Sequence, residues 1–405
     1  MASARTERSV ARSTTEQLGD GFVQNPYAVY QRLRAEGPVS RVVMPGGFPV
    51  WVITRYADAR AALADPRLIK DWRTLWPGSP APDDGFALLD THMLSTDPPD
   101  HDRLRRLVTK AFTARRIERL RPRVAEITTS LLDAMPADGP VDLLEAFAFP
   151  LPITVICELL GVPDSDRASF RAWTQAVLST GEAPAESGTA AMEMAGYFTA
   201  LVADKRAHPA DDLLSALIAA RDAGDGLSKR ELLGMLFLLL VAGHETTVNL
   251  IGSGTLALLR SPGELGRLRA DPSLLPGAVE ELLRYTSPVN HATFRFTAEA
   301  VEIGGSLIPA REPVLVALAS ANRDPDRYPA PDRLDVGRDA GGNLAFGHGI
   351  HYCLGAPLAR MEGVIAFGAL LSRFPGLTLA VPPESLRWRP STLIRGLETL
   401  PVRLA

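Results

Sequence analysis

Apolar positions recur at helical spacing along most of the chain, and the longest such run lies near its middle. Ser228 to Arg260 form one continuous pattern that opens with a capping box of Ser228 and Glu231 and ends just before Pro262. At about 1.5 Å per residue, a helix of this length spans roughly 50 Å. The segment Leu354 to Arg373 has the same periodicity, and Pro357 is tolerated in its first turn. The pattern therefore predicts a mainly helical protein with one very long helix.

Alternating and β-branched residues are confined to short segments. Val39 to Met44 and Pro49 to Thr54 are such segments, and the Pro45-Gly46-Gly47 turn between them predicts a hairpin. Residues 66–92 carry many Pro, Gly and Asp residues, which predicts a long loop of the kind that is often functional. Two further helices are expected at 164–180 and 189–208, with a break at 181–188.

Composition limits the class of protein. Hydrophobic residues make up 46% and charged residues 22%, which is ordinary for a globular protein, and a net charge of −4 gives no basis for nucleic-acid binding. The first twenty residues have no apolar run, so we expect a disordered tail at 1–20 with no signal peptide and no membrane anchor. The apolar stretch 232–243 is too short to span a bilayer. A cytoplasmic protein is expected, without a disulfide between its two cysteines, Cys157 and Cys353.

Cys353 stands at the end of a glycine-rich loop, residues 346–355, just before a predicted helix. A cysteine binds metal as the thiolate, and a helix N-terminus lowers the pKa of a thiol. This setting predicts a metal site, with haem iron as the first candidate. Two alternatives stay open, a buried structural cysteine and a zinc site that uses His348, His351 and Cys353, although no fourth ligand pair is evident.

The long helix contains a second informative segment, Ala242 to Thr247. Gly243 costs about 1 kcal/mol in a helix interior, and Thr246 can bond a carbonyl one turn back, so the helix could open locally and make room for something small. The alternative is that Gly243 only eases packing. Further along the chain, Glu281 and Arg284 are helix neighbours, and such a pair is usually solvated.

These motifs together resemble the cytochrome P-450 superfamily over most of the chain. Residues 346–355 match the haem-loop pattern F-G-x-G-x-H-x-C-x-G, and residues 242–246 resemble the oxygen-binding groove of the distal helix. Glu281 to Arg284 matches E-x-x-R, and residues 97–106 resemble the first haem-contacting helix. The resemblance implies a mainly α fold with small β-sheets (α+β), a triangular prism in which haem is buried between the distal helix and the cysteine-loop helix. It also implies a single catalytic domain at 21–405.

The resemblance assigns roles to individual residues. Cys353 would ligate the iron of haem b, and Glu245 and Thr246 would relay protons to oxygen. Arg333 would be the third member of a buried structural lock with Glu281 and Arg284. The other implied haem-contacting residues are His101, Arg105, Ala242, Gly243, Arg295, Phe346, Gly347, His351 and Gly355. The implied substrate pocket comprises Leu88, Leu89, Leu239, Ala242, Val289, Asn290, Thr293, Leu393 and Ile394.

The activity implied by the resemblance is that of a haem-thiolate monooxygenase. Lys70, Asp71, Trp72 and the stretch 239–252 look like the actinobacterial branch that hydroxylates macrolides, other polyketides and sterol-like compounds such as vitamin D. The expected reaction is hydroxylation or epoxidation of a bulky, mostly apolar small molecule, such as a macrolide, a sterol-like compound or a cyclic peptide, by a monomeric enzyme that uses dioxygen.

Electrons must come from a partner, because two cysteines cannot hold an iron–sulfur cluster and no flavin or nicotinamide motif is evident. A ferredoxin with its NAD(P)H-dependent reductase is implied. Its expected docking face comprises Arg103, Arg106, Lys110, Arg115 and Arg116. Two other activities remain open, a peroxide-dependent haem-thiolate enzyme and a haem-binding sensor without catalysis.

Overall fold

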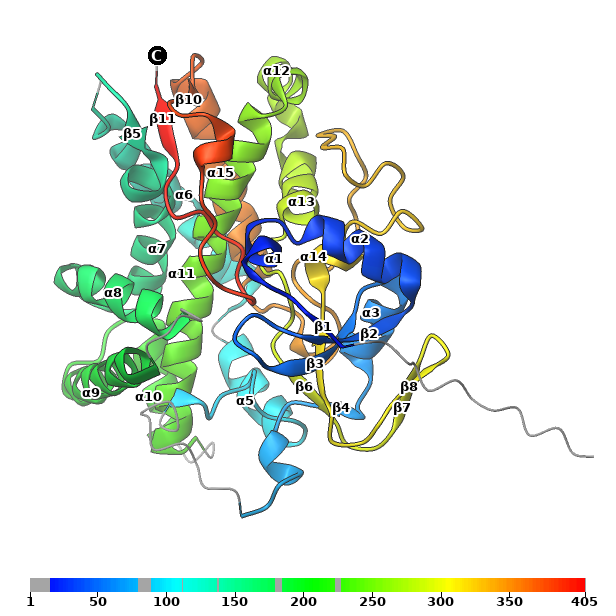
Figure 1. The fold of residues 1–405 in the computed structure, drawn as a ribbon. Coiled ribbons are helices and arrows are strands. Elements are labelled where there is room, and N and C mark those ends of the chain that lie inside the picture. The colour runs from blue at the N-terminus through cyan, green and yellow to red at the C-terminus, as the bar shows by residue number, and fades with distance from the viewer. Residues whose placement is uncertain are drawn as a thin grey trace, which may run out of the picture.

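The helix α11 (Lys229–Leu259) crosses the middle of the molecule, with several helices on one side of it and the main β-sheet, together with further helices, on the other (Figure 1). The computed structural model describes residues 15–78, 89–110, 112–136, 138–178, 184–222 and 227–404. Most of the described chain is helical and the strands are short, which confirms the predicted α+β class.

The remaining described helices are α1 (Asp20–Gln24), α2 (Tyr27–Glu36), α3 (Tyr56–Ala64), α5 (Asp100–Thr109), α6 (Ala114–Asp133), α7 (Pro150–Leu160), α8 (Arg167–Leu178), α9 (Pro184–Ala207), α10 (Leu213–Asp222), α12 (Pro262–Ala270), α13 (Leu275–Thr286), α14 (Leu318–Ala321) and α15 (Ala356–Arg373). The strands are β1 (Glu16–Gln17), β2 (Val39–Val43), β3 (Pro49–Ile53), β4 (Leu68–Ile69), β5 (Val141–Asp142), β6 (Arg295–Thr297), β7 (Val301–Ile303), β8 (Ser306–Ile308), β9 (Pro313–Val316), β10 (Thr378–Leu379) and β11 (Pro401–Arg403).

The predicted ends of α11 are confirmed. The Ser228 hydroxyl accepts from the Glu231 N–H at 3.2 Å, and the Glu231 carboxylate accepts from the Ser228 N–H at 2.7 Å. These two bonds satisfy donors that a helix start leaves free. By length and composition α11 could cross a membrane, but 78% of its apolar window is buried inside the protein, as in the core helix of a globular fold.

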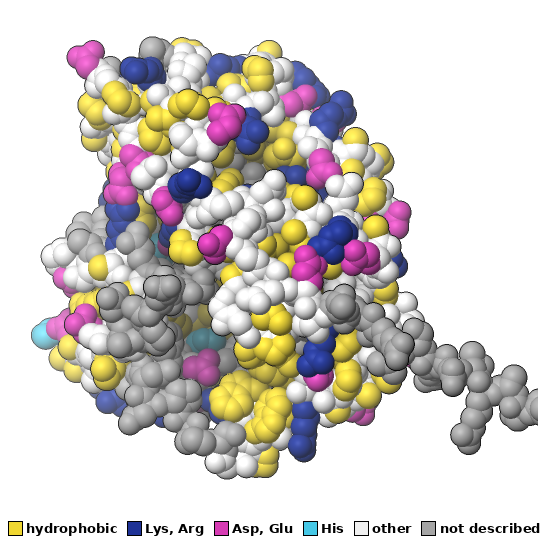
Figure 2. Space-filling view, viewed as in Figure 1, with side chains coloured by type: hydrophobic (Ala, Val, Ile, Leu, Met, Phe, Trp, Pro, Cys, Tyr) yellow, Lys and Arg dark blue, Asp and Glu magenta, His cyan; other side chains and the backbone are white. Residues whose placement is uncertain are grey.

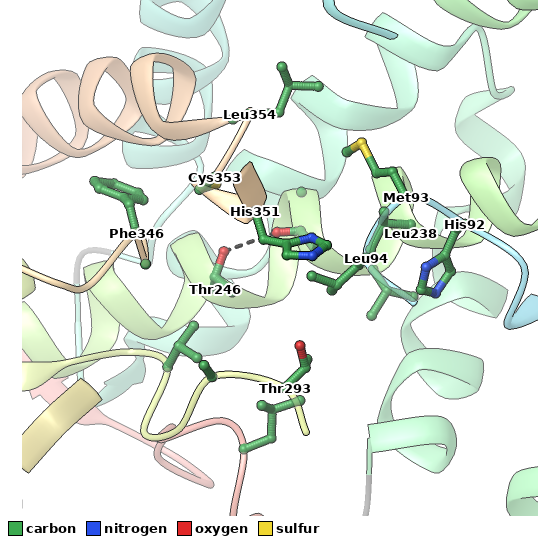
Figure 3. A pocket seen from close by; sticks show the side chains of 18 of the residues that line it. His92, Met93, Leu94, Leu238, Thr246, Thr293, Phe346, His351, Cys353 and Leu354 are labelled. Carbon is green, nitrogen blue, oxygen red and sulfur yellow. Dashed lines mark hydrogen bonds between the residues drawn. The ribbon is translucent and has the colours of Figure 1, made fainter. Parts of the chain in front are cut away.

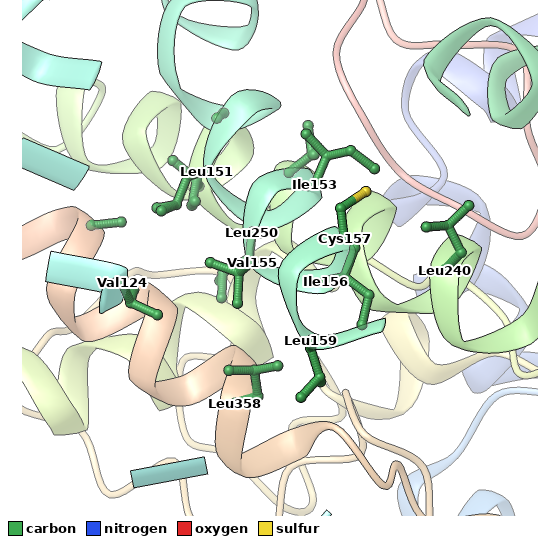
Figure 4. Close-up of a cluster of buried hydrophobic side chains, with 14 of the residues drawn as sticks. Val124, Leu151, Ile153, Val155, Ile156, Cys157, Leu159, Leu240, Leu250 and Leu358 are labelled. Atoms are coloured by element: carbon green, nitrogen blue, oxygen red, sulfur yellow. The ribbon is translucent and has the colours of Figure 1, made fainter. Parts of the chain in front are cut away.

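The main core lies where α7 packs against α11. Figure 4 shows the contact, with Ile156 and Cys157 of α7 beside Leu240 of α11. A Cβ placed on Gly243 would stand 2.8 Å from Ile156 Cγ1, so the glycine lets the two helices approach. Of the two interpretations of Gly243, the packing one is supported, and α11 runs through this point as an uninterrupted helix.

The predicted hairpin is also confirmed. Strands β2 and β3 pair antiparallel, with Val39 opposite Ile53, and the turn is made by Gly46 and Gly47 at positive φ. They belong to a six-stranded sheet of order β1-β2-β3-β9-β6-β4, which brings residues 295–297 and 313–316 beside the N-terminal strands. Strands β10, β11 and β5 form a second sheet, and β7 and β8 a third.

Three predicted boundaries need correction. The tail was predicted to reach residue 20, but Glu16 and Gln17 pair with β2 and Leu18 is buried, because β2 leaves an edge that β1 covers. The predicted loop 66–92 contains β4 and a 3-10 turn at Trp72–Thr74. The predicted break at 181–188 ends early, since α9 begins at Pro184. Residues 1–14 of the tail and 79–88 of the loop lie outside the described residues.

Candidate active site

The cysteine loop is folded back on itself. The Cys353 N–H donates to the Phe346 carbonyl at 2.9 Å, and Gly347 and Gly349 between them have positive φ. A Cβ on Gly349 would stand 2.7 Å from the Leu63 carbonyl oxygen, so this position requires glycine. The loop is thereby closed tightly and presents Cys353 at the start of α15.

The Cys353 side chain is accessible from an internal cavity. Burial among the surrounding residues raises the pKa of its thiol, while the N–H groups of Gly355 and Ala356 and the guanidinium of Arg105 act in the opposite direction. In the protein alone, burial therefore outweighs the helix N-terminus, and the expected lowering of the thiol pKa depends on the metal. A metal at the sulfur is needed to hold the thiolate.

One cavity of about 660 Å³ joins the cysteine loop to α11. Its lining includes Cys353 from the loop and Ala242, Gly243, Glu245 and Thr246 from α11. Figure 3 shows Cys353 and Thr246 around this space. The Thr246 hydroxyl donates to the Ala242 carbonyl at 3.0 Å, which is the bond that the sequence predicted. The sulfur and the polar segment of α11 thus share one space.

The Glu245 carboxylate is almost completely buried and forms an ion pair with Arg389, which lies near the C-terminus. The Arg389 guanidinium also donates to Asn249 Oδ1 at 2.9 Å, and His244 Nε2 lies 3.7 Å from Glu245 Oε2. A Cβ on Gly396 would stand 2.0 Å from Asn249 Oδ1, so Gly396 leaves room for this cluster. Arg389 was not predicted.

Basic side chains gather on another part of the cavity wall, which includes His351 of the cysteine loop. The rings of His101 and His351 are 4.5 Å apart, and Arg295 donates to the carbonyls of Leu63 and Leu68. His101 Nε2, His351 Nε2 and Arg295 Nε are buried and have no hydrogen-bond partner within the described part of the chain. Burial lowers the pKa of Arg295 to about 10.

These unpartnered donors and the Cys353 sulfur line one cavity, and together they fit a haem. Its two propionates are anions that need donors of this kind, and Arg105, which also lines the cavity, adds a fourth group. Of the other predicted haem contacts, Phe346, Gly347 and Gly355 line the same cavity. Within the described ranges, no three His, Cys, Asp or Glu side chains come together as ligands, so the zinc alternative gains no support.

Lys70 is a further cation on this part of the cavity wall that the sequence did not single out for the site. Its buried ammonium donates to the carbonyls of Thr293 and Phe294, each at 3.0 Å, and to the Thr293 hydroxyl. Burial and the neighbouring Arg295 place the pKa of Lys70 well below its ordinary value. Thr293 and Phe294 line the cavity, and Lys70 therefore fixes the part of the cavity wall that they form.

Most predicted pocket residues line the cavity, and two do not. The lining includes Leu239, Ala242, Val289, Thr293, Leu393 and Ile394. Leu89 is instead buried in the main core, and Asn290 points away to accept from the Tyr30 hydroxyl at 2.8 Å and to donate to the Thr392 carbonyl. Leu88 lies outside the described residues.

Phe294 lines the cavity and is also 41% exposed, so its ring belongs both to the cavity wall and to the outer surface. The Phe294 ring meets that of Phe48 at 5.4 Å, and Phe48 is exposed too. In Figure 2, hydrophobic side chains gather on the part of this face where Figure 1 draws β4 and β6. An apolar molecule would meet a matching surface here.

The Glu281–Arg284 pair is fully buried, so the solvated alternative is wrong. Arg284 donates to both Glu281 oxygens, at 2.6 and 2.8 Å. The third member is Arg338, whose Nε lies 3.2 Å from Glu281 Oε1. The prediction of Arg333 was wrong, because its side chain is 72% exposed and pairs with Asp335.

Comparison with known proteins agrees with this geometry. The cytochrome P-450 family model matches residues 189–391. The monooxygenase PikC of Streptomyces venezuelae is 55% identical over 95% of this chain and 92% of its own, and the vitamin D(3) 25-hydroxylase of Pseudonocardia autotrophica is 52% identical over 95% and 94%. The tirandamycin C-bound structure of the P-450 monooxygenase TamI superposes with a TM-score of 0.91 at 55% identity, covering 96% of this chain and all of TamI.

The chain belongs to the cytochrome P-450 family. It is accordingly an oxidoreductase of the P-450 monooxygenase class, and its cofactor is haem b ligated by a cysteine thiolate.

Proposed function

We propose that this enzyme inserts one oxygen atom from dioxygen into a C–H or C=C bond of a bulky, mostly apolar small molecule. The observation that carries the proposal is the shared cavity. It is lined by the Cys353 sulfur, by the Ala242–Thr246 segment and by apolar side chains. Thiolate-ligated haem supplies the activation of dioxygen. The protein residues bind the haem, admit the substrate and deliver protons.

Glu245 and Thr246 are proposed as the proton path. The Thr246 hydroxyl is held at the cavity by its bond to Ala242, and the Glu245 carboxylate lines the same cavity while Arg389 contacts it from the partly exposed side. A carboxylate that joins solvent to a hydroxyl at the reacting oxygen is suited to repeated proton transfer. His101, Arg105, Arg295 and His351 are proposed to hold the propionates.

The substrate class follows from the walls and from the relatives. Leu239, Val289, Leu393 and Ile394 offer apolar surface of the kind that binds a large hydrophobic molecule. Among similar proteins are a 6-deoxyerythronolide B hydroxylase, 48% identical, and a vitamin D(3) 25-hydroxylase. A macrolide-like polyketide or a sterol-like compound is therefore proposed, with a cyclic peptide as a further candidate.

A ferredoxin with its NAD(P)H-dependent reductase is proposed to supply the electrons, although the predicted docking face changes. Arg103 is paired with Asp100 and Glu231, and Arg116 with Asp211, so neither offers a free charge. Arg106 and Arg115 are exposed, Lys110 is exposed but has an interaction within the protein, and Ile350 and Tyr352 of the cysteine loop are exposed apolar residues. This smaller set is proposed to dock an acidic ferredoxin on the cysteine side.

The enzyme is proposed to act as a monomer in the cytoplasm. The test is turnover of the haem-loaded protein with a surrogate ferredoxin, its reductase and NADPH, against macrolactones, vitamin D3 and steroids. We expect a product that contains one oxygen atom derived from labelled dioxygen. Turnover with peroxide alone would favour the peroxide-dependent alternative, and coupled consumption of NADPH and dioxygen with any hydroxylated product would exclude the sensor.

A further inference from the structure

The cavity has a polar group at the end away from the cysteine loop that neither the haem nor the proton path uses. His92 is 7% exposed and lines the cavity, and its Nδ1 has no hydrogen-bond partner among the described residues. In Figure 3 its ring lies beside Leu94 and Leu238, on the other side of the view from Phe346. A buried polar atom without a partner is costly unless a ligand or water satisfies it.

The other polar groups near His92 are already bound. The Lys70 ammonium donates to Thr293 and Phe294, and the Arg73 Nε donates to Asp71 at 2.7 Å. The Ser95 hydroxyl donates to the carbonyls of Asp90 and His92. Among the described residues, the His92 Nδ1 is therefore a buried polar atom of this part of the cavity that has no hydrogen-bond partner.

The position of His92 is fixed by the protein. Its ring stacks on Phe237 of α11, with centroids 6.3 Å apart and an interplanar angle of 15°. Its N–H donates to the Ser95 hydroxyl at 3.2 Å, and its carbonyl accepts from the Ser95 N–H at 3.0 Å. A Cβ on Gly234 would stand 2.4 Å from the Thr91 carbonyl oxygen, so this glycine lets the segment lie directly on α11. A residue held in this way can select the orientation of a ligand.

The ring is also neutral under ordinary conditions. Burial lowers the pKa of His92 to about 4, and the cations of Lys70 and Arg73 act in the same direction. A neutral imidazole offers one donor and one acceptor. It therefore suits a hydroxyl or carbonyl oxygen better than a carboxylate.

The distance between His92 and the reacting site can be judged from residue positions along α11. Phe237, on which His92 stacks, precedes Thr246 by nine residues of α11, or about 13 Å along the helix axis. We propose that His92 is a specificity-determining residue that hydrogen-bonds a hydroxyl or carbonyl oxygen of the substrate, at the end remote from the carbon that is oxidised. This inference rests on the proposed function, and it narrows the substrate to an extended apolar molecule with an oxygen at its far end.

The test uses probes that do not depend on knowing the substrate. An imidazole nitrogen binds haem iron, so 1-alkylimidazoles of increasing chain length anchor one end at the iron and extend the other along the cavity. Each is compared with the ω-hydroxyalkyl imidazole of the same length, because a hydroxyl can both donate to and accept from His92. The readout is the dissociation constant from absorbance titration of the haem-loaded protein.

We expect the hydroxyl to improve affinity about 3- to 10-fold at one range of chain lengths. His92→Phe should abolish this preference while keeping the ring on Phe237, His92→Gln should retain part of it, and His208→Phe, the same change at an exposed histidine, should leave it intact. No preference at any length, or a preference that survives His92→Phe, would overturn the inference and leave the proposed function standing. Absence of an absorbance shift with every imidazole would overturn both.

Discussion

The guanidinium of Arg389 forms an ion pair with the carboxylate of Glu245, which joins the C-terminal part of the chain to the centre of the distal helix. The Glu245 carboxylate is buried and Arg389 is partly exposed. The ion pair therefore connects the buried active site with solvent. The geometry makes Arg389 a positioning residue that acts through Glu245.

Arg389→Gln should therefore impair proton delivery without removing haem. The variant leaves a buried carboxylate without its cation, which should cost about 2 to 3 kcal/mol in the free energy of unfolding. Peroxide released per NADPH oxidised should rise several-fold, because an unanchored Glu245 no longer serves the path. Both are measured on haem-loaded protein, with Arg389→Lys as the control that keeps a cation. Unchanged coupling in Arg389→Gln would exclude a role for this pair.

Thr246→Ala should separate oxygen consumption from product formation. The substitution removes the hydroxyl that lies one turn from Ala242 but leaves the cavity and its basic end in place. Haem content and substrate affinity should stay near those of the wild type, while most reducing equivalents should appear as peroxide. Thr247→Ala, a change at the neighbouring position, serves as the comparison. Normal coupling in Thr246→Ala would refute the proposed path.

Glu281→Gln should destabilise the fold. It removes the carboxylate from a buried cluster in which Arg284 and Arg338 both depend on it, which should cost about 3 to 5 kcal/mol. Arg333→Gln is the matched control, because an exposed pair contributes little and the change should stay within about 0.5 kcal/mol. Urea unfolding measures both. Equal effects of the two substitutions would contradict the assignment of Arg338.

Glu362 should make stability depend on pH. Burial raises the pKa of this α15 carboxyl from 4.5 to about 8, with Thr247 opposing only in part. The folded state therefore holds a proton that the unfolded chain releases, so the contribution of Glu362 to stability declines as pH rises from about 4.5 to about 8. Glu362→Gln removes this decline.

The difference in unfolding free energy between Glu362→Gln and wild type should be near zero at about pH 4. It should grow to the order of 3 kcal/mol in favour of Glu362→Gln at about pH 8. Urea midpoints across this range measure it. A difference that does not change with pH would show that Glu362 is charged in the folded protein.

The parts of the site that form between residues close in sequence could be predicted from the sequence. The cysteine loop, the capping box of α11 and the Thr246-to-Ala242 bond each join residues a few positions apart, and the structure contains all three. Local spacing and turn chemistry are enough to predict contacts of this kind.

Contacts between segments far apart in the sequence could not be predicted from local patterns. Arg389 reaches Asn249 across 140 residues, and neither position has a local pattern that signals the other. Arg338 replaced Arg333 in the buried cluster because the path of the chain after Pro331 decides which arginine faces Glu281. His92 has no local pattern that marks it as a cavity residue, and its place in the cavity wall depends on packing against Phe237 of a distant helix.

The assignment of Cys353 as the haem ligand is tested most directly by the absorbance difference spectrum of the dithionite-reduced, haem-loaded protein with and without carbon monoxide. We expect the red-shifted band of thiolate-ligated haem, and its loss in Cys353→Ser. A band at the position of histidine- or thiol-ligated haem in the wild type would contradict the assignment of Cys353, and the monooxygenase proposal would lose its foundation.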